Sequence, residues 1–366
     1  MRLSPSRVER YYSCAFSYFC QAGLRLRPRG KVDYDPIQSG SLIHLVLEKM
    51  VRRHGGRGLA ALSAEQLRKE AAQIIQQELS AKIAGLAEMP ARFQFLFKRL
   101  VNILVRLLQR LGAEFAQSDY QPAAFELPIG ERERVKPLHL VAADGTQVVV
   151  EGIVDRVDLL RRGGRRYVRV VDYKSGQKVF RLSDVYYGLN LQMLIYLFAL
   201  CDSTPGMLPG GVLYMPAMTQ MATVPRDASP QAVQAEQQKR LRMNGLLLED
   251  RESLEAMEPG LAGVFIPARL KKDGQFDANS SLANLAQMGV IRRQVEKQLT
   301  GLAESLHQGR VQAMPAQGEG ASARPPCDWC DYRSLCGHEE GDPVRLLAEL
   351  DRQEALQAMK GGEQDG

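Results

Sequence analysis

In the first third of the chain, hydrophobic residues recur at intervals of three and four positions, with polar residues between them. This spacing places the hydrophobic side chains on one side of a helix and therefore predicts amphipathic helices. Ser4 followed by Pro5 is typical of a helix start, because serine caps a helix and proline fits its first turn. The predicted helices cover residues 4–23, 37–54 and 64–118, with a break near Pro90 in the last.

After residue 120 the pattern changes to short segments that are rich in valine and isoleucine. Such segments predict β-strands, and Gly163-Gly164 predicts a tight hairpin between two of them. Four arginines flank the tip of this hairpin, where they either remain solvated or contact phosphate groups. The predicted strands cover residues 125–129, 147–160, 166–173 and 208–215, with a short edge strand at 265–267.

The second half of the chain returns to helical spacing in three places. These helices are predicted over residues 183–201, with Ser183 as the cap, over 281–308 and over 343–359. Strands that alternate with helices predict an α/β fold, with a mixed sheet flanked by helices. We expect one domain over residues 1–340, made of a helical part (37–118), a sheet core (121–217) and a cysteine-bearing segment (315–340), followed by a C-terminal helix and tail over 341–366.

The amino-acid composition indicates a globular protein and argues against a disordered or membrane-spanning one. With 366 residues, of which 45% are hydrophobic and 25% charged, the chain can bury a substantial core and is globular rather than disordered. No apolar run reaches the roughly 20 residues of a membrane span. The N-terminus also lacks the apolar stretch of a signal peptide, so we expect a cytoplasmic protein that does not enter a membrane.

The net charge of +6 is unevenly distributed. Eight acidic and three basic residues lie between His338 and the C-terminus, so the preceding 337 residues carry a net charge of +11. This basic body suits a polyanionic partner such as nucleic acid. An arginine-rich composition without such a partner would explain the charge equally well.

The most informative polar residues end the strand predicted over 166–173. Because side chains alternate along a strand, Asp172 and Lys174 lie on one face and Tyr173 on the other. Antiparallel pairing across the hairpin would bring the carboxylate of Asp155 beside Asp172. Two carboxylates and one ammonium group suit a Mg²⁺ site that hydrolyses phosphodiester bonds. Asp158 faces the opposite side, where we expect it to pair with arginine. The alternative is that all these charges are solvated on a surface hairpin.

Four of the six cysteines form an unequal pattern, with one near the N-terminus and three as C-x2-C-x5-C near the other end. In the cytosol, thiols at such spacing favour metal ligation over disulfides. Thiolates bind iron–sulfur clusters, but the same four would also hold zinc. Cys20 and Cys201 fall outside the pattern, and we expect them to be buried thiols. The four candidate ligands are Cys14, Cys327, Cys330 and Cys336.

Together these motifs resemble the RecB-like branch of the PD-(D/E)xK nuclease superfamily, with its restriction-endonuclease-like core. Gly40-Ser41-Leu42-Ile43-His44, with Glu48, resembles the G-x-x-x-H helix of that branch. Gln192-Met193-Leu194-Ile195-Tyr196 resembles its Q-x-x-x-Y motif. The resemblance implies that His44 and the carbonyl of Tyr173 join the two aspartates at the metal. It also implies that Gln192 and Tyr196 face the active site and position the DNA strand, while Lys174 orients the attacking water or stabilises the phosphate charge.

Within that superfamily, the chain is most similar to the nuclease region of the AddB family of helicase–nuclease subunits. The segments that carry this likeness are Leu3–Arg7, Tyr11–Cys14, Asp184–Gln192 and Phe265–Ala268. The likeness implies a [4Fe-4S] cluster on the four cysteines as a staple between the chain ends. It further implies an exonuclease that degrades single-stranded DNA from an unwound duplex end, with preference for the 5′-terminated strand. The implied partner is an AddA-like helicase–nuclease subunit, and the implied process is recombinational repair of double-strand breaks.

The chain departs from the AddB family in one respect, because the helicase-like portion that precedes the nuclease region there is not in this sequence. We also find no G-x-x-x-x-G-K-[ST] phosphate loop, so this chain alone is not expected to hydrolyse ATP. Two other functions therefore stay open. One is a free-standing exonuclease of CRISPR adaptation or repair, and the other is a non-catalytic DNA-binding module.

Overall fold

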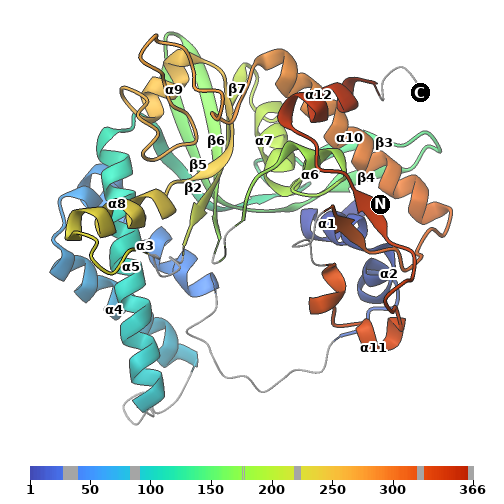
Figure 1. Ribbon diagram of the computed structural model, residues 1–366, viewed down its shortest axis with the longest axis horizontal. Helices are drawn as coiled ribbons and strands as arrows, with labels where there is room; N and C mark the ends of the chain where they lie inside the picture. Colours follow the sequence, from blue (N-terminus) through green and yellow to red (C-terminus); the bar gives the residue numbers. More distant parts are fainter. Residues whose placement is uncertain are drawn as a thin grey trace.

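The computed structural model describes residues 1–27, 40–82, 91–174, 176, 178–217, 224–319 and 325–361. At its centre lies a six-stranded sheet with the order β2-β5-β6-β7-β8-β9 (Figure 1). β6 pairs parallel with β7, and β8 with β9, whereas the other pairs are antiparallel. The predicted α/β fold with a mixed sheet is therefore confirmed. The strands are β2 (Gln121–Ile129), β5 (Gly152–Arg162), β6 (Arg165–Lys174), β7 (Met207–Pro216), β8 (Asn244–Leu248) and β9 (Leu282–Ala283).

β5 and β6 form an antiparallel hairpin, as predicted, and are the second and third strands of this sheet. Gly163 and Gly164 occupy its tip with φ values of 56° and 74°, a left-handed conformation that glycine adopts at little steric cost. The tip lies at the opposite end of the strands from Asp172. Two of the flanking arginines form ion pairs there, Arg162 with Asp119 and Arg165 with Asp250.

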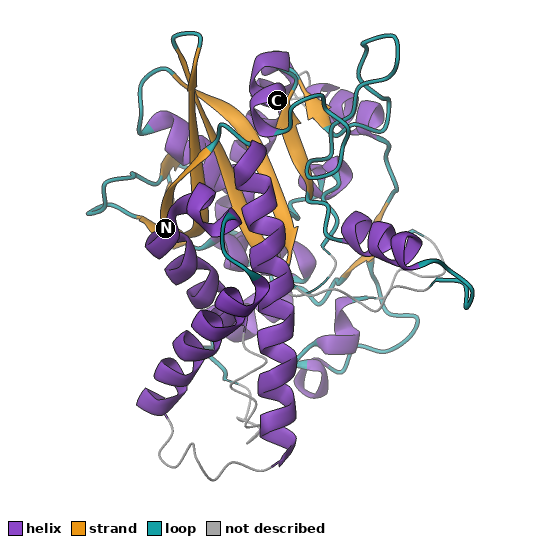
Figure 2. Cartoon of the chain, turned by 90° about the vertical axis from the view of Figure 1, so that its left-hand side faces the viewer, coloured by secondary structure: helices purple, strands orange, loops and turns teal. Residues whose placement is uncertain are grey.

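Three long helices lie on one side of the sheet, on the left in Figure 1 and in front of the strands in Figure 2. They are α3 (Gly40–Ala60), α4 (Ala64–Lys82) and α5 (Ala91–Gln117). α3 and α5 approach closely where a Cβ added to Gly112 would lie 3.0 Å from the Cα of Ala60. These helices match the prediction, whose residues 37–39 and break near Pro90 lie outside the described residues.

The helices α6 (Leu182–Tyr186), α7 (Gln192–Asp202), α10 (Leu285–His307) and α12 (Arg352–Gly361) lie on the other side (Figure 1). The single helix predicted over 183–201 is wrong, because Gly188 and Asn190 adopt positive φ values and turn the chain between α6 and α7. Arg181, not Ser183, precedes the first helical residue. The helix predicted over 281–308 is confirmed, whereas the last helix begins later than predicted, after a short strand β11 (Arg345–Leu347).

The N-terminal segment is not the continuous helix that its spacing predicts. It divides into α1 (Pro5–Ser13), α2 (Ala15–Tyr18) and a π-helical turn (Phe19–Gly23). The break falls at Cys14, whose backbone is extended with φ −165° and ψ 115°. Ser4 precedes α1 as expected, but its side chain makes no capping hydrogen bond. The break leaves the thiol of Cys14 free to turn away from the helix face.

Shorter elements complete the fold. β1 (Arg2–Leu3), β4 (Gln147–Val150) and β3 (Leu138–Val141) form a second sheet, and β10 (Ala316–Gly318) pairs with β11. α8 (Pro230–Arg240) and α9 (Arg251–Met257) flank β8, a strand that the sequence pattern did not predict. Residues 265–267 are not the predicted edge strand, since β9 occupies that edge. Among the helices of the described ranges, none has both the length and the apolar character needed to cross a bilayer.

Candidate active site

One row of residues crosses the sheet at neighbouring positions of five strands. Asp172 pairs with Tyr214, and Tyr214 pairs with Asn244. On the other side, Arg156 pairs with Val171, so that Asp155 lies beside Asp172. Phe125 pairs with Arg156, so that Glu126 lies beside Asp155. The predicted meeting of the two aspartates is thus present in the strand register, and the row runs Glu126, Asp155, Asp172, Tyr214, Asn244.

Three potential metal ligands converge at one end of this row. Ligand atoms of His44, Glu126 and Asp155 all lie within 4.8 Å of one another. His44 Nδ1 is 3.5 Å from Asp155 Oδ2 and 3.7 Å from Glu126 Oε1. His44 lies on α3 and not on a strand of the sheet. The histidine of the G-x-x-x-H motif therefore contacts Asp155 of β5 from a neighbouring helix.

The hydrogen bonds of His44 orient its ring. Its Nε2 lies 3.0 Å from the carbonyl oxygen of Tyr173, and a carbonyl can only accept, so Nε2 carries the proton. In the neutral ring the lone pair of Nδ1 therefore points toward the carboxylates of Asp155 and Glu126. One ring nitrogen and two carboxylates that face one another form an arrangement that a cation would stabilise.

Asp172 and Lys174 lie next to this group, on the same face of β6. Lys174 Nζ is 2.8 Å from Asp172 Oδ2. Asp172 is only 3% exposed, and burial and then the neighbouring Asp155 carboxylate raise its pKa to about 6, against the lowering effect of Lys174. Burial also raises the pKa of Asp155, while His44 lowers it. The two aspartates thus face each other with too little positive charge around them.

Gln192 begins α7, and Tyr196 lies one turn further on, beside the start of β5. Burial raises the pKa of Tyr196, and hydrogen bonds from the Gln192 side chain and the backbone of Ile153 partly offset this rise. A side chain at residue 152 would collide with the Tyr196 hydroxyl, which explains the glycine three residues before Asp155. Tyr196 is buried, so its contact is with the strand that carries Asp155.

The opposite face of β5 and β6 holds a closed group of charges. Asp158 is fully buried and accepts hydrogen bonds from Arg156 at 2.7 Å and from Arg169 at 2.8 Å. Glu114, from α5, pairs with both arginines. Burial alone would raise the pKa of Asp158, but Arg156 and Arg169 outweigh it and hold the pKa below its usual value. The expected pairing of Asp158 with arginine is confirmed.

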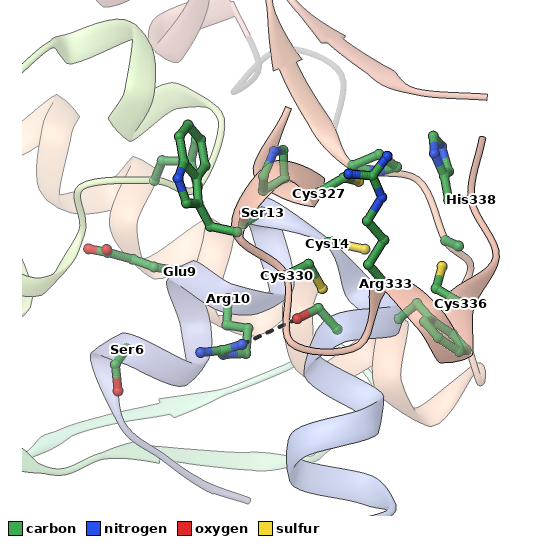
Figure 3. Close-up of a pocket in the computed structure, with 17 residues that line it drawn as sticks. Ser6, Glu9, Arg10, Ser13, Cys14, Cys327, Cys330, Arg333, Cys336 and His338 are labelled. Carbon is green, nitrogen blue, oxygen red and sulfur yellow. Dashed lines mark hydrogen bonds between the residues drawn. The ribbon is translucent and has the colours of Figure 1, made fainter. Parts of the chain in front are cut away.

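The four patterned cysteines lie around one cavity of about 380 Å³ between the N-terminal helices and the segment near the other chain end (Figure 3). Cys327 lies in a 3-10 turn (Pro326–Trp329), Cys330 follows it, and Cys336 ends α11 (Arg333–Cys336). All six cysteines are free thiols. Burial raises the pKa of Cys14 and of Cys327, and in both cases the other thiols of the group raise it further. Cys20 is buried, as expected, whereas Cys201 is partly exposed.

Three residues of the row, Glu126, Tyr214 and Asn244, were not identified from the sequence. Glu126 interrupts the apolar pattern of the strand predicted over 125–129, and this single carboxylate was the available signal. Its φ of 47° is unusual for a non-glycine residue and is typical of functional positions. Tyr214 gave no signal, because its place beside Asp172 depends on the register between β6 and β7.

Comparison with known proteins agrees with this geometry. A family model described as the PD-(D/E)XK nuclease superfamily matches residues 2–337. That range includes the row across the sheet, His44 and the cysteines, so the resemblance drawn from the sequence motifs is confirmed.

The chain is also similar to curated proteins that are named as one subunit of an ATP-dependent helicase/deoxyribonuclease. It is 32% identical to that of Caldanaerobacter subterraneus subsp. tengcongensis over 93% of the chain, 33% identical to that of Moorella thermoacetica over 96%, and 29% identical to that of Clostridium acetobutylicum over 98%. These matches cover 30%, 31% and 32% of the respective relatives. The chain thus spans about a third of the length of the curated relatives it matches.

Proposed function

Because the chain belongs to the PD-(D/E)XK nuclease superfamily, we propose that it is an exonuclease that hydrolyses the phosphodiester bonds of DNA. The observation that carries this proposal is the convergence of His44, Glu126 and Asp155, with Asp172 and its partner Lys174 on the adjacent strand. A module that only binds DNA has no need for a buried and a partly buried carboxylate side by side next to a lysine.

The donor set fits a hard divalent cation, and Mg²⁺ is the one we propose. Apart from its ion pair with Lys174, the buried Asp172 Oδ2 has no hydrogen-bond partner within the described residues, which supports a cation as a further partner. His44, Glu126, Asp155 and Asp172 would hold the ion. The carbonyl of Tyr173, which the resemblance adds to the ligands, accepts a hydrogen bond from His44 Nε2, which is not the ring nitrogen that faces the carboxylates. When bound, Mg²⁺ supplies Lewis-acid activation of a water molecule and neutralises charge at the phosphate.

The remaining residues have roles that their contacts support. Lys174 is partly exposed beside Asp172, where its ammonium group orients the attacking water or stabilises charge on the phosphate. Tyr196 fixes the start of β5 through Ile153 and so holds Asp155 in place. Gln192 at the first turn of α7 is less buried than Tyr196 and contacts the DNA strand directly.

Cleavage of a labelled single-stranded oligonucleotide by the purified protein tests this function. We expect products with Mg²⁺ and none with a chelator. Labels at the 5′ or the 3′ end, on separate substrates, then report the direction of degradation, for which we propose attack on the 5′-terminated strand. Absence of cleavage under all these conditions would contradict the nuclease assignment.

The names of the similar proteins support a wider role. We infer that the chain is the nuclease part of an AddB-like helicase–deoxyribonuclease, working in the cytoplasm with an AddA-like helicase–nuclease partner. Its substrate would then be single-stranded DNA from an unwound duplex end, during recombinational repair of double-strand breaks. Copurification of the protein with that partner, and stimulation of cleavage on blunt duplex ends by the partner and ATP, would test this role.

The donor set at the cysteine cavity fits a soft metal group. Four thiols from both ends of the chain surround one cavity. Burial, and then the neighbouring thiols, raise the pKa of Cys14 and of Cys327, so thiolates there need a cationic centre. We propose a [4Fe-4S] cluster held by Cys14, Cys327, Cys330 and Cys336. It would join segments more than 300 residues apart in sequence and contribute stability by closing that long loop.

Metal analysis of anaerobically purified protein separates this cluster from zinc. We expect about four iron atoms per chain. Cys14→Ser should lose the iron, whereas Cys201→Ser, a matched change outside the cavity, should keep it. About one zinc and no iron per chain would contradict the cluster.

A further inference from the structure

A second polar cleft, of about 260 Å³, opens on the far side of Lys174 from the metal ligands. Its described lining contains five basic side chains and no acidic one. We call it the cationic cleft. Its basic residues are Lys174, Lys178, Lys239, Arg240 and Arg242.

Separate elements bring these charges together. Lys174 ends β6, and Lys178 follows it in the segment before α6. Lys239 and Arg240 end α8, and Arg242 lies in the turn that leads into β8. Basic residues at a helix C-terminus are common because they suit the helix dipole. That explanation does not cover Arg242, Lys174 or Lys178, which lie outside the helix.

The cleft has more positive charge than its neighbours neutralise. Lys178 lies 3.7 Å from Glu9, and Arg240 lies 3.2 Å from Glu236. Lys239 and Arg242 are exposed, and neither forms an ion pair with the residues that the structure describes. An anion in the cleft would therefore meet two cations without competing carboxylates.

Tyr214 provides an independent sign of a ligand. Its ring lies under both lysines, 6.0 Å from Lys174 Nζ and 5.0 Å from Lys178 Nζ. It is 1% exposed, and its buried hydroxyl has no hydrogen-bond partner among the described residues. Buried hydroxyls are usually paired, so an unpaired one at a cleft suggests a group that arrives with the substrate. Because Tyr214 pairs with Asp172 across the strands, it lies one strand away from the metal ligands.

We propose that the cationic cleft binds the phosphodiester backbone of the DNA strand adjacent to the bond that is cut. This inference rests on the proposed nuclease function. The carboxylate ligands lie on β2, β5 and β6, and the cleft lies across β6, β7 and β8, so the DNA strand would cross the sheet along the row. Lysine and arginine contacts to phosphate fix the position of a strand without reading its sequence.

A double substitution, Lys239→Ala with Arg242→Ala, tests the cleft without changing a residue of the active site. We expect the KM for a long single-stranded oligonucleotide to rise about 10-fold, with kcat within about 2-fold of the parent. Hydrolysis of bis(4-nitrophenyl) phosphate, whose single phosphate cannot extend into the cleft, should be unchanged. Lys271→Ala with Lys272→Ala removes the same charge from exposed lysines elsewhere and should behave as the parent.

Tyr214→Phe supplies a second test in the same assays. Because the hydroxyl has no partner within the described protein, its removal should not lower the melting temperature, yet the KM for the oligonucleotide should rise a few-fold. For the double substitution, the slope of log K against log salt should fall by roughly 0.7 for each lost phosphate contact.

The outcomes separate the cleft from the nuclease function. If the parent cuts DNA and the double substitution leaves KM and the salt slope unchanged, the proposal that the cleft binds the DNA backbone is wrong and the nuclease function stands. If the parent cuts neither substrate, the nuclease function fails. Oligonucleotide binding, measured by fluorescence anisotropy with a chelator present, then still tests whether the cleft binds DNA. The proposal requires that the double substitution weakens binding and that its matched control does not.

Discussion

The two faces of β5 and β6 carry charges in opposite arrangements. On the face toward α5, Asp158 and Glu114 are paired with two arginines, and the whole group is buried. On the other face, Asp155 and Asp172 lie side by side, with Lys174 as the nearby cation. Asp155 and the arginine that follows it are neighbours in sequence, yet strand alternation places them in these different environments.

The difference shows in the acids themselves. Two arginines hold the pKa of Asp158 below its usual value, whereas burial and Asp155 raise the pKa of Asp172 to about 6. Tyr173 joins the faces, since its carbonyl lies at His44 and its hydroxyl accepts a hydrogen bond from Arg156 at 3.3 Å. The buried group of Asp158 and its arginines therefore stabilises the two strands. The strands in turn hold Asp155 and Asp172 in the geometry that a cation needs.

We call the face of Asp155, Asp172 and Lys174 the unpaired face, and the face of Asp158 and its two arginines the paired face. The largest effect is expected on DNA cleavage, when a charged residue of the unpaired face is removed. Asp172→Ala or Lys174→Ala should lower Mg²⁺-dependent DNA cleavage by about 1,000-fold or more, because each removes a group that acts on charge at the phosphate. Initial rates on a labelled oligonucleotide measure the loss. Asp273→Ala, which changes an exposed aspartate in a loop, should cleave at the parent rate. Parent-like rates in both active-site variants would show that these residues are wrongly assigned.

Removing an arginine from the group of Asp158, Glu114, Arg156 and Arg169 should instead destabilise the folded protein. Arg156→Met leaves the charges of Asp158 and Glu114 buried with one cation fewer, so the free energy of unfolding should fall by about 3 kcal/mol. Urea unfolding with a constant slope measures it. Arg161→Met, on the exposed end of the same strand, should change stability by less than about 0.5 kcal/mol. Equal effects of the two changes would contradict a stabilising role for the buried group.

Metal binding should act on the unpaired face alone. At about 100 times its dissociation constant, Mg²⁺ should stabilise the parent by about 2.7 kcal/mol. His44→Ala removes one ligand and should reduce this gain, whereas His139→Ala, an exposed histidine on β3, should not. Thermal unfolding with and without Mg²⁺ measures both. A gain that is the same in all three proteins would place the ion elsewhere.

Acid should lower the free energy of unfolding through Asp158, by less than the removal of Arg156 does. The pKa of Asp158 is lower in the folded protein than the roughly 3.9 of an unfolded chain, so its contribution is present above that pH and is lost as pH falls toward the folded value. Unfolding free energies measured between neutral and acidic pH should fall less steeply in Asp158→Asn than in the parent. An identical slope in the two proteins would show that Asp158 is not the group responsible.

The parts of the site that sequence could predict depend on local order along the chain. Asp155, Asp172 and Lys174 follow from a hairpin whose turn is marked by Gly163-Gly164, because register in a hairpin is set by its turn. Tyr214 and Asn244 depend on pairing between strands separated by helices, which alternation within each strand does not determine. Sequence pattern therefore predicted only Asp155 and Asp172, the two members of the row that lie on the hairpin.

The same limit explains the errors in the fold. The spacing around Cys14 is helical on both sides, and only packing against the distant cysteine segment gives a reason for the break there. β8 was hidden because its run Gly245-Leu246-Leu247-Leu248 fits a buried helix as well as a buried strand. In both cases the deciding contacts come from residues far away in sequence.

One paired measurement tests the account most directly: the free energy of unfolding without metal and the DNA cleavage rate with Mg²⁺, for Asp172→Asn and Asp158→Asn. The account predicts that Asp172→Asn loses cleavage but is as stable as the parent or more stable, because it removes an incompletely paired buried charge. Asp158→Asn should be destabilised by about 3 kcal/mol and should retain cleavage per folded molecule. Equal destabilisation by both changes, or full cleavage by Asp172→Asn, would contradict the division of roles between the two faces.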